Sequence, residues 1–389
     1  MPHALRYESG AVMANRRGKG EGSISQRPNG LWEARINVGT DATGKRMRKS
    51  VYGSTKKEVA DKLTKLAHQK LDGTLIDTGR MTVGDLLDKW LEDSARLSVA
   101  PSTLNRYEGL VKRSIKPHLG TIKLSLLKPI HIQGMLSKLE QQKAGDETRR
   151  YSFQVLRRAL NVAERWGLIV RNPCGMVDQP KVTRREISPL TVEQVQSLLK
   201  ISSGHRLHAL FVLAITSGLR QGELFAIHWA DIDLKAGVLA VRYTLEEVKS
   251  QLRLKEPKSK SGRRSVKLPA MAVAALWEHK AQQLTEGLAS SKLVFCDANG
   301  QFLRKSNFAR RDWKPIRAKA EIADTVVFHD LRHTSASLLL ATGAHPKVVQ
   351  ERLGHSKISL TMDTYSHLMP GMQDDAAAKL DIALRVRSA

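Results

Sequence analysis

Apolar and polar residues alternate near the N-terminus in the manner of β-strands. Asn29-Gly30 is a hairpin signal, a second turn is expected at 41–44, and Thr55 with Glu58 predicts a capping box that opens a helix. On the strand after the first turn, one face carries Trp32, Ala34, Ile36 and Val38, and the other carries Glu33, Arg35 and Asn37. The pattern predicts a three-stranded sheet backed by one helix over residues 21–75.

A helical period replaces this alternation over residues 80–178. The first helix face is made by Val83, Leu86, Leu87, Trp90 and Leu91. Further helices are expected from Ser102, from about Pro129 and from about Glu147. The pattern predicts an all-helical domain, and the stretch from Pro180 to Arg185 reads as the linker that follows it.

Residues 185–389 mix both periods and are mostly helical. Thr191 with Gln194 forms another capping box, and the run from Arg206 to Ile215 is apolar enough for a buried helix. Two strands are expected, at Val238–Arg242 and Arg264–Leu268. The expected fold class is therefore multidomain and mainly α with small β sheets, ending in a mixed α+β domain.

The net charge of the chain indicates which kind of partner it binds. The chain carries 64 Lys and Arg against 38 Asp and Glu, a formal net charge of +26. Such an excess repels itself unless a polyanion is the working partner, and nucleic acid is the usual one. A generic basic protein, such as a ribosome-associated factor, is the alternative. Residues 1–20 are expected to form a flexible basic tail, within which Met13 is a candidate true start.

The third predicted strand concentrates positive charge at Arg46, Arg48 and Lys49, and Arg35 lies on the strand before it. A small sheet with a basic outer face is a candidate major-groove reader. These four residues are therefore the candidate DNA contacts of the N-terminal domain. The alternative is a solvated sheet face, since exposed strand faces are commonly charged.

Cysteine usage and hydropathy exclude several classes of protein. Cys174 and Cys296 lie far apart, and no CxxC pair or Cys/His zinc spacing is present, so a disulfide scaffold or zinc finger is not expected. No apolar run approaches the roughly 18–20 residues that a membrane span needs. No secretory signal precedes the basic N-terminus, so we expect a reducing, cytoplasmic compartment.

Cations and histidines in the last half of the chain are the candidates for chemistry. Arg220 lies at a break between two helical stretches, where it is placed to aim a bidentate fork at a phosphate, with Glu223 orienting it. A capping ion pair is the alternative for these two residues. His329 and Arg332 share a helix face, which suits a phosphodiester because the Arg holds charge and the His moves a proton.

His329 and His333 also have metal-ligand spacing, but the residues between them do not match the metalloprotease pattern. Because Arg332 beside a bound cation is unfavourable, no metal is expected. Tyr365 lies near several His and Arg residues, including His355. A phenol of pKa about 10 needs such neighbours to act as a nucleophile, and simple packing is the alternative for an isolated Tyr.

Together these segments resemble the tyrosine recombinase family, and specifically the lambda-type integrases of phages and integrative elements. The ordered set that carries the resemblance is Arg220, Lys260, His329, Arg332, His355 and Tyr365. The phrases Ser-Gly-Leu-Arg-Gln-Gly-Glu-Leu, His-Asp-Leu-Arg-His-Thr and Leu-Gly-His-Ser are similar to the family's own, and Tyr365 follows His355 at a family-like spacing. Residues 21–75 resemble an arm-type DNA-binding domain, 80–178 a core-site DNA-binding domain and 185–389 a catalytic domain.

The resemblance implies a mechanism. Tyr365 would attack a DNA phosphate, form a 3′-phosphotyrosine and free a 5′-hydroxyl, which then attacks the phosphotyrosine of the partner strand. Arg220 and Arg332 would clamp the non-bridging oxygens with His355 as a further donor, and His329 would accept a proton. Lys260, at an expected hairpin tip, would protonate the leaving oxygen. Lys258 is its close rival, and a basic loop that only touches DNA is the alternative. No metal, ATP or other cofactor is implied.

The resemblance also implies partners and a biological role. The expected partners are double-stranded DNA attachment sites, further copies of the chain in a homo-tetramer on DNA, an accessory DNA-bending protein and an excisionase, with no membrane. The expected role is integration, and help in excision, of a phage or mobile element in the cytoplasm of a bacterial host, at the nucleoid. A non-catalytic DNA-binding protein and a metal-dependent nuclease are the competing functions.

Overall fold

The computed structural model describes residues 22–40, 46–71, 81–182, 189–257 and 260–359, together with positions 362, 381 and 384. Its internal contacts divide the chain between Thr183 and Arg184 into two compact units. The N-terminal unit contains two separate clusters of buried apolar side chains, one in the sheet region and one in the helical region. The C-terminal unit is built around a third, larger cluster.

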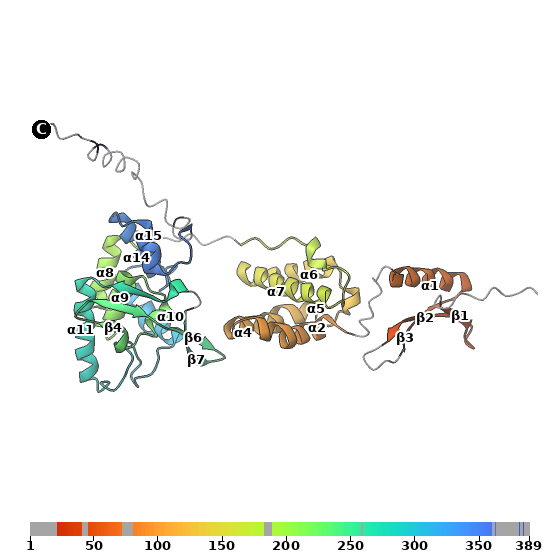
Figure 1. Ribbon diagram of the computed structural model, residues 1–389, viewed down its shortest axis with the longest axis horizontal. Coiled ribbons are helices and arrows are strands. Elements are labelled where there is room, and N and C mark those ends of the chain that lie inside the picture. Colours follow the sequence, from red (N-terminus) through yellow and green to blue (C-terminus); the bar gives the residue numbers. More distant parts are fainter. Residues whose placement is uncertain are drawn as a thin grey trace, which may run out of the picture. The chain divides into compact units, whose positions relative to one another are not determined.

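The N-terminal sheet is antiparallel, and one helix covers one of its faces (Figure 1). Its elements are β1 (Ser23–Gln26), β2 (Trp32–Thr40), β3 (Arg46–Gly53) and α1 (Lys56–Leu71). Ala34 and Ile36 of β2 are buried against Val59 and Leu63 of α1. The alternation in the sequence is thereby confirmed, because a strand that packs on one side buries every second residue.

The start of α1 differs from the expected capping box. The backbone N–H of Glu58 donates to Thr55 Oγ1 over 3.2 Å, as predicted, but the Glu58 carboxylate accepts from the backbone N–H of Ser54 over 3.0 Å. The same carboxylate also accepts from the Ser54 hydroxyl and from Lys62 Nζ. The Glu58 carboxylate thus bonds to the N–H of Ser54, one residue before Thr55, whose N–H was the predicted donor. Only half of the predicted capping box therefore forms.

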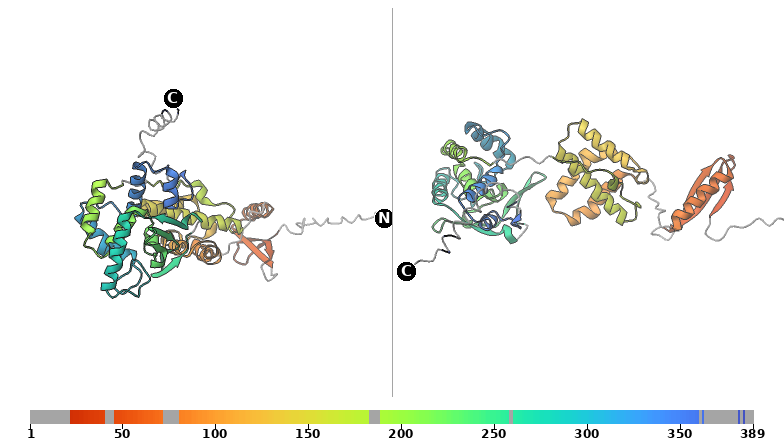
Figure 2. Two further views of the ribbon diagram at one scale, coloured as in Figure 1. Left: turned by 60° about the vertical axis from the view of Figure 1, so that its left-hand side comes forward. Right: turned by 90° about the horizontal axis from the view of Figure 1, so that it is seen from above.

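The next segment is helical, and its helices are grouped around one core (Figure 2). Its α-helices are α2 (Val83–Trp90), α3 (Arg96–Ser98), α4 (Pro101–Leu110), α5 (Lys116–Leu119), α6 (Pro129–Gln141) and α7 (Asp146–Arg165). Wider helical turns at Leu91–Ala95 and Val111–Ile115 join α2 to α3 and α4 to α5, and single turns lie at Leu124–Leu126 and Pro173–Met176. Trp90 of α2 and Phe153 of α7 are buried in the core.

The C-terminal unit combines helices with two small sheets. Its helices are α8 (Val192–Ser202), α9 (His208–Ser217), α10 (Gln221–Leu224), α11 (Ala270–Thr285), α12 (Lys305–Phe308), α13 (Lys314–Lys319), α14 (Asp330–Ala341) and α15 (Pro346–Leu353). Its strands are β4 (Ile232–Asp233), β5 (Val238–Val241), β6 (Thr244–Val248), β7 (Gln251–Lys255) and β8 (Arg264–Lys267). Short turns occupy Trp229–Asp231, Lys260–Gly262 and Ala309–Trp313. This confirms a mainly α fold with small antiparallel sheets.

The strand pairing corrects the expectation that Lys260 lies at a hairpin tip. One sheet has the order β4-β5-β8, and the other is the β6-β7 hairpin. The hairpin tip is instead at Lys249 and Ser250, whose φ angles of 50° and 65° suit a tight two-residue turn. Because β7 and β8 belong to different sheets, the segment that carries Lys260 links two sheets.

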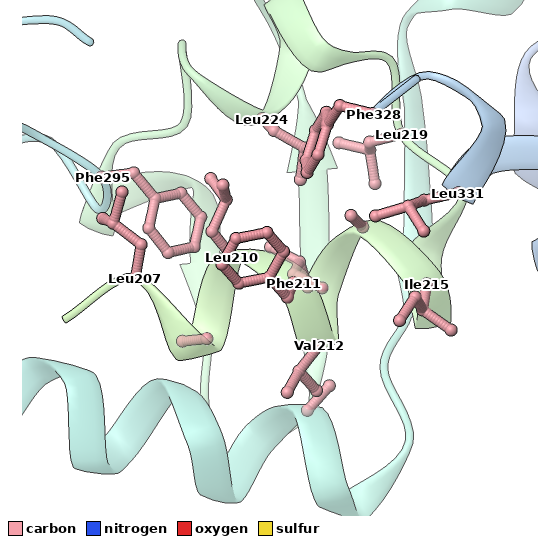
Figure 3. Packing of buried hydrophobic residues seen from close by; sticks show 14 of the residues in the cluster. Leu207, Leu210, Phe211, Val212, Ile215, Leu219, Leu224, Phe295, Phe328 and Leu331 are labelled. Atoms are coloured by element: carbon pink, nitrogen blue, oxygen red, sulfur yellow. The ribbon is translucent and has the colours of Figure 1, made fainter. Parts of the chain in front are cut away.

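Helix α9 forms the centre of the C-terminal unit (Figure 3). Its residues from Ala209 to Ile215 are all buried, as the apolar run predicted, because helices α8, α11 and α14 pack around it. Phe211 lies against the rings of Phe308 and Phe328 at centroid distances of 6.0 and 6.1 Å. At the start of α8, Thr191 and Gln194 form the predicted reciprocal capping box. Among the described residues, no helix is both long and apolar enough to cross a lipid bilayer.

Candidate active site

The turn between α9 and α10 presents Arg220. Gly218 ends α9 with a φ of 64°, in the left-handed region that glycine tolerates best. A Cβ at this position would lie 2.6 Å from Leu353 Cδ2, so the close approach of α15 also requires glycine here. Arg220 is the N-cap residue directly before α10, and 42% of its side chain is exposed. Arg220 therefore has surface available to a ligand while its backbone is held rigidly.

Glu223 forms the capping ion pair with Arg220 that was the alternative interpretation of the sequence, and the same bonds orient the Arg220 side chain. Its carboxylate accepts from the backbone N–H of Arg220 and from Arg220 Nη1, each over 2.9 Å. Burial acts to raise the pKa of Glu223, but the hydrogen bonds and charge of Arg264, with help from Arg220, leave this pKa below its ordinary value. A buried carboxylate between two guanidinium groups is costly to disturb, since removing one partner of a buried pair typically costs about 3–5 kcal/mol.

Arg332 ties the end of α9 to the end of α15. Its Nη1 donates to the carbonyl oxygen of Gly218 and its Nη2 to that of Leu353, both over 2.8 Å. Only 4% of Arg332 is exposed, which makes it far more enclosed than Arg220. Arg332 of α14 thus contacts the turn that leads to Arg220; the Arg220 side chain is half-exposed, whereas that of Arg332 is a buried link.

His355 follows directly from a second left-handed glycine. Gly354 ends α15 with a φ of 68°, and its added Cβ would lie 2.8 Å from the carbonyl oxygen of Ser261 and 2.9 Å from Arg264 Nη1. The backbone N–H of His355 donates to the carbonyl oxygen of Gln350 over 3.1 Å, and Gln350 Nε2 donates back to that of His355 over 3.0 Å. The glycine of the Leu-Gly-His-Ser phrase therefore has a structural reason, and the backbone bonds of His355 fix the place of the residue that follows it.

The electrostatics of the site keep two histidines neutral. The pKa of His329 is lowered to about 4, first by burial of the ring and then by the neighbouring His333 and Arg332. The pKa of His355 is also lowered to about 4, by burial and then by Arg332 and Arg220. Taken as a whole residue, His329 is nevertheless exposed to solvent. Because both rings are uncharged near pH 7, each has one nitrogen that donates and one that accepts.

His333 lies beside His329, with the ring centroids 5.6 Å apart and the rings almost perpendicular. This is the pair with metal-ligand spacing. Within the part of the chain that the structure describes, no group of three or more His, Cys, Asp or Glu side chains is arranged to hold a metal ion.

Two of the predicted catalytic side chains lie outside the described residues. They are the side chains of Tyr365 and Lys260, and Lys258, the rival of Lys260, also lies outside. The backbone of Lys260 begins the turn Lys260–Gly262, but the position of its side chain is not described. The close approach of Gly354 to Ser261 nevertheless brings this turn beside the segment that carries His355. The choice between the two lysines stays a prediction.

Sequence reasoning missed Arg264, which contacts several parts of this site. Its side chain is 7% exposed and donates to the Glu223 carboxylate through Nη2 over 2.9 Å and Nη1 over 3.2 Å. A signal was present: in a strand, Arg264 falls on the same face as Val266, which is buried. A cation at a core-facing strand position requires a buried partner, and Glu223 is that partner.

The four candidate DNA contacts of the N-terminal sheet are not equivalent. Arg35 and Arg48 lie on the face away from α1, since they oppose Ser50 and Asn37 respectively. Lys49 opposes Ile36 and therefore lies on the helix-covered side, which corrects its place on a basic outer face. The reason is strand alternation, because neighbours in one strand cannot share a face. Arg46 pairs with Thr40, and its side chain lies outside the described residues.

Arg35 is also engaged within the sheet. Its Nε and Nη2 donate to the Glu33 carboxylate over 2.9 and 3.0 Å, and Arg27 Nε donates to the same group over 2.9 Å. Tyr52 Oη adds a further bond of 3.1 Å. These hydrogen bonds, Arg35 first and then Arg27, lower the pKa of Glu33 to about 2. The outer face thus carries an organised ion cluster.

The chain is similar to known proteins over most of its length. Residues 189–371 match the phage integrase family, and residues 82–140 match the phage integrase N-terminal SAM-like domain. A tyrosine recombinase XerC-like protein of Caldanaerobacter subterraneus subsp. tengcongensis is 33% identical over 373 residues, which cover 89% of this chain and 94% of the relative. An integrase of Streptomyces ambofaciens is 28% identical, over 94% of this chain and 97% of its own length.

Solved structures show the same fold. The Tn1549 transposon integrase in complex with a circular intermediate DNA superposes with a TM-score of 0.66 at 21% identity, covering 78% of this chain and 99% of that one. A lambda integrase dimer bound to a core site gives a TM-score of 0.58 at 18% identity, over 93% and 96%. The extent of the match to the bacterial relative and the two domain matches agree with one another. The chain belongs to the phage integrase family of tyrosine recombinases and is a site-specific DNA recombinase.

Proposed function

We propose that Arg220, Lys260, His329, Arg332, His355 and Tyr365 form the catalytic set of this recombinase. The observation that carries the proposal is the meeting of two turns at the Arg332 side chain in the C-terminal unit. Arg332 donates to Gly218 in the turn before Arg220 and to Leu353 in the turn before His355. Three segments that are far apart in the sequence, those of Arg220, Arg332 and His355, are thus held next to one another, as a phosphate clamp requires.

The reaction conserves the energy of the phosphodiester. The Tyr365 oxygen attacks phosphorus, the bond to the 5′-oxygen breaks, and a 3′-phosphotyrosine forms. The freed 5′-hydroxyl of the partner strand then attacks that phosphotyrosine and releases the tyrosine. His329 takes the phenol proton, and Lys260 supplies the proton that the leaving 5′-oxygen needs.

The charges around the site suit such a transfer. Arg220 is the exposed cation available to non-bridging oxygens, with Arg332 behind it and neutral His355 as a further donor. His329 is neutral and so able to accept a proton. A bound phosphodiester adds negative charge, which raises the pKa of both histidines and makes His329 a better base.

We extend the proposal to the partners and domains. Residues 21–75 would bind arm-type DNA, 80–178 core-site DNA, and 185–389 would carry catalysis, with 1–20 as a basic tail. A homo-tetramer on double-stranded attachment sites would perform the exchange, and a lambda integrase of the same fold has been solved as a tetramer bound to a Holliday junction. A DNA-bending protein and an excisionase would assist. With chromosomal DNA as its substrate, the enzyme would act in the cytoplasm of its bacterial host.

The test uses a nicked half-site built from the repeats that flank the element, incubated with the full chain in EDTA. An SDS-resistant protein–DNA adduct that maps to Tyr365 is expected, and Tyr365→Phe should abolish it while DNA affinity stays nearly unchanged. Adduct formation only with a divalent metal would support a nuclease instead. Tight binding without an adduct on a verified site would support a non-catalytic DNA-binding protein.

A further inference from the structure

One buried guanidinium contacts three separate segments of the active site. Arg264, the first residue of β8, makes the two bonds to Glu223 described above. Its Nη1 also donates to the carbonyl oxygen of Gly262 over 3.2 Å, and its Nε donates to that of Arg352 over 2.7 Å. The guanidinium group is planar and rigid, and its three nitrogens donate in different directions. It therefore sets the distances between Glu223, Gly262 and Arg352.

Each partner belongs to a segment that carries a proposed catalytic residue. Glu223 holds the backbone and side chain of Arg220. Gly262 is the last residue of the turn that Lys260 begins. Arg352 lies in the final turn of α15, three positions before His355. A shift of Arg264 would therefore move all three segments, although the Arg264 side chain is only 7% exposed and offers little surface to a phosphate.

The surroundings of Arg264 leave it little freedom to shift. A Cβ on Gly354 would lie 2.9 Å from Nη1, so glycine at this position makes room for the guanidinium. Arg352 also donates through Nη2 to the carbonyl oxygen of Thr216 at the end of α9, over 2.7 Å. The carbonyl that accepts from Arg264 thus belongs to a residue that is itself bonded to α9.

We propose that Arg264 is a positioning residue for DNA cleavage, which holds the segments of Arg220, Lys260 and His355 in register without touching the scissile phosphate. This inference rests on the catalytic set proposed above. A lysine cannot replace Arg264, because an ammonium group offers three donors from one point and cannot span carbonyl and carboxylate partners on different sides.

The test compares Arg264→Lys with Arg263→Lys in the full chain. Arg263 is the adjacent residue, but it is 60% exposed and pairs with the equally exposed Glu256, so it is a matched control with the same chemical change. Single-turnover formation of the Tyr365 adduct on a nicked half-site is expected to fall about 100-fold or more in Arg264→Lys, as for a small misplacement of catalytic groups. DNA affinity should stay within about twofold, and Arg263→Lys should match the wild type in both measurements.

A substrate with a 5′-bridging sulfur separates positioning from a general loss of structure. Its leaving group departs without a proton, so the part of the loss that comes from a misplaced Lys260 turn should be recovered in Arg264→Lys. Partial recovery, above the level of an Arg220→Ala variant, is expected because the Arg220 segment is also shifted. No recovery at all would overturn the link to the Lys260 turn, and wild-type cleavage rates in Arg264→Lys would overturn the whole inference.

The experiment also distinguishes this inference from the proposed function. Absence of the Tyr365 adduct in the wild-type chain would reject the catalytic set itself, whereas a normal wild-type adduct with an unaffected Arg264→Lys rejects only the positioning role. If Arg264→Lys does not fold, Glu223→Gln takes its place, since it preserves shape and weakens the bonds of Arg264 and Arg220 together. The same loss of cleavage with retained affinity is then expected, and unchanged cleavage would contradict the inference.

Discussion

Two glycines, Gly218 and Gly354, place the proposed active-site residues that follow them. Each ends a helix with a φ between 64° and 68°, and each leaves no room for a Cβ. Gly218 precedes Arg220 by two residues, and Gly354 directly precedes His355. At the scale of single residues, the site therefore depends on backbone positions that other amino acids would strain.

Gly354→Ala and Gly343→Ala provide a matched pair. Both glycines follow helices with positive φ, but a Cβ on Gly343 would meet nothing within 4 Å. We expect Gly343→Ala to lower the free energy of unfolding by about 1–2 kcal/mol, the cost of the left-handed backbone. Gly354→Ala should cost more and should slow adduct formation as well. Equal losses in denaturant titrations would show that the contacts with Ser261 and Arg264 do not matter.

Histidine titration should appear in the stability of the free protein. His329 and His355 have pKa values near 4 when folded, below the ordinary 6.5, so the unfolded chain binds protons more readily between these values. Their contribution to stability is complete above pH 6.5 and is lost as pH falls toward 4. The Tm should decline over this window, less steeply in His355→Gln than in the wild type or in His68→Gln, a change on exposed α1 surface. Identical slopes in all three proteins would reject this assignment.

At the scale of elements, the outer face of the N-terminal sheet is organised by a carboxylate. Glu33 is 2% exposed although alternation places it on the face away from α1, because Arg27, Arg35 and Tyr52 cover it. Both arginines remain more than 40% exposed. A carboxylate that engages one edge of each guanidinium limits the orientations that the remaining donors can take toward base edges.

Glu33→Gln is expected to reduce the ability of the chain to distinguish an arm-type site from random DNA by several-fold. The matched control is Glu58→Gln, which removes the same charge from the same domain at the start of α1, where Glu58 pairs with Lys62. Both variants should bind random DNA slightly more tightly, because each adds one net positive charge. Competition titrations would measure the ratio, and equal selectivity in the two variants would argue against a recognition role for the cluster.

At the scale of the whole molecule, separate cores allow separate tasks. The apolar cluster of the N-terminal sheet includes no residue of the clusters in the helical segment or the C-terminal unit. Residues 1–75 can therefore be removed without opening the other cores. The net charge of +26 supplies a general attraction to DNA that the remaining chain would partly keep.

Deletion of residues 1–75 is expected to spare cleavage of an isolated core site, within about threefold in rate, because the proposed catalytic set lies in the C-terminal unit. Integration into a complete attachment site should be severely reduced, since the proposed arm contacts are lost. Adduct formation on half-sites and a plasmid integration assay measure the two activities. Normal integration by the truncated chain would exclude the arm-binding role.

The sequence by itself determined the features that depend on neighbours a few residues apart. The alternation around Ala34 and Ile36, the apolar run of α9 and the capping box of Thr191 and Gln194 are local patterns, and the structure contains each of them. The order of Arg220, His329, Arg332 and His355 pointed to one family for the same reason, because its motifs are short and contiguous.

Only the tertiary structure decided which distant groups meet. Strand pairing placed the Lys260 turn between two sheets instead of at a hairpin tip, and alternation in β3 turned Lys49 away from the outer face. Arg264 became part of the site through Glu223 and Arg352, 41 and 88 positions away in the sequence. Burial of a cation depends on a partner that the chain brings to it, and local patterns carry no information about that partner.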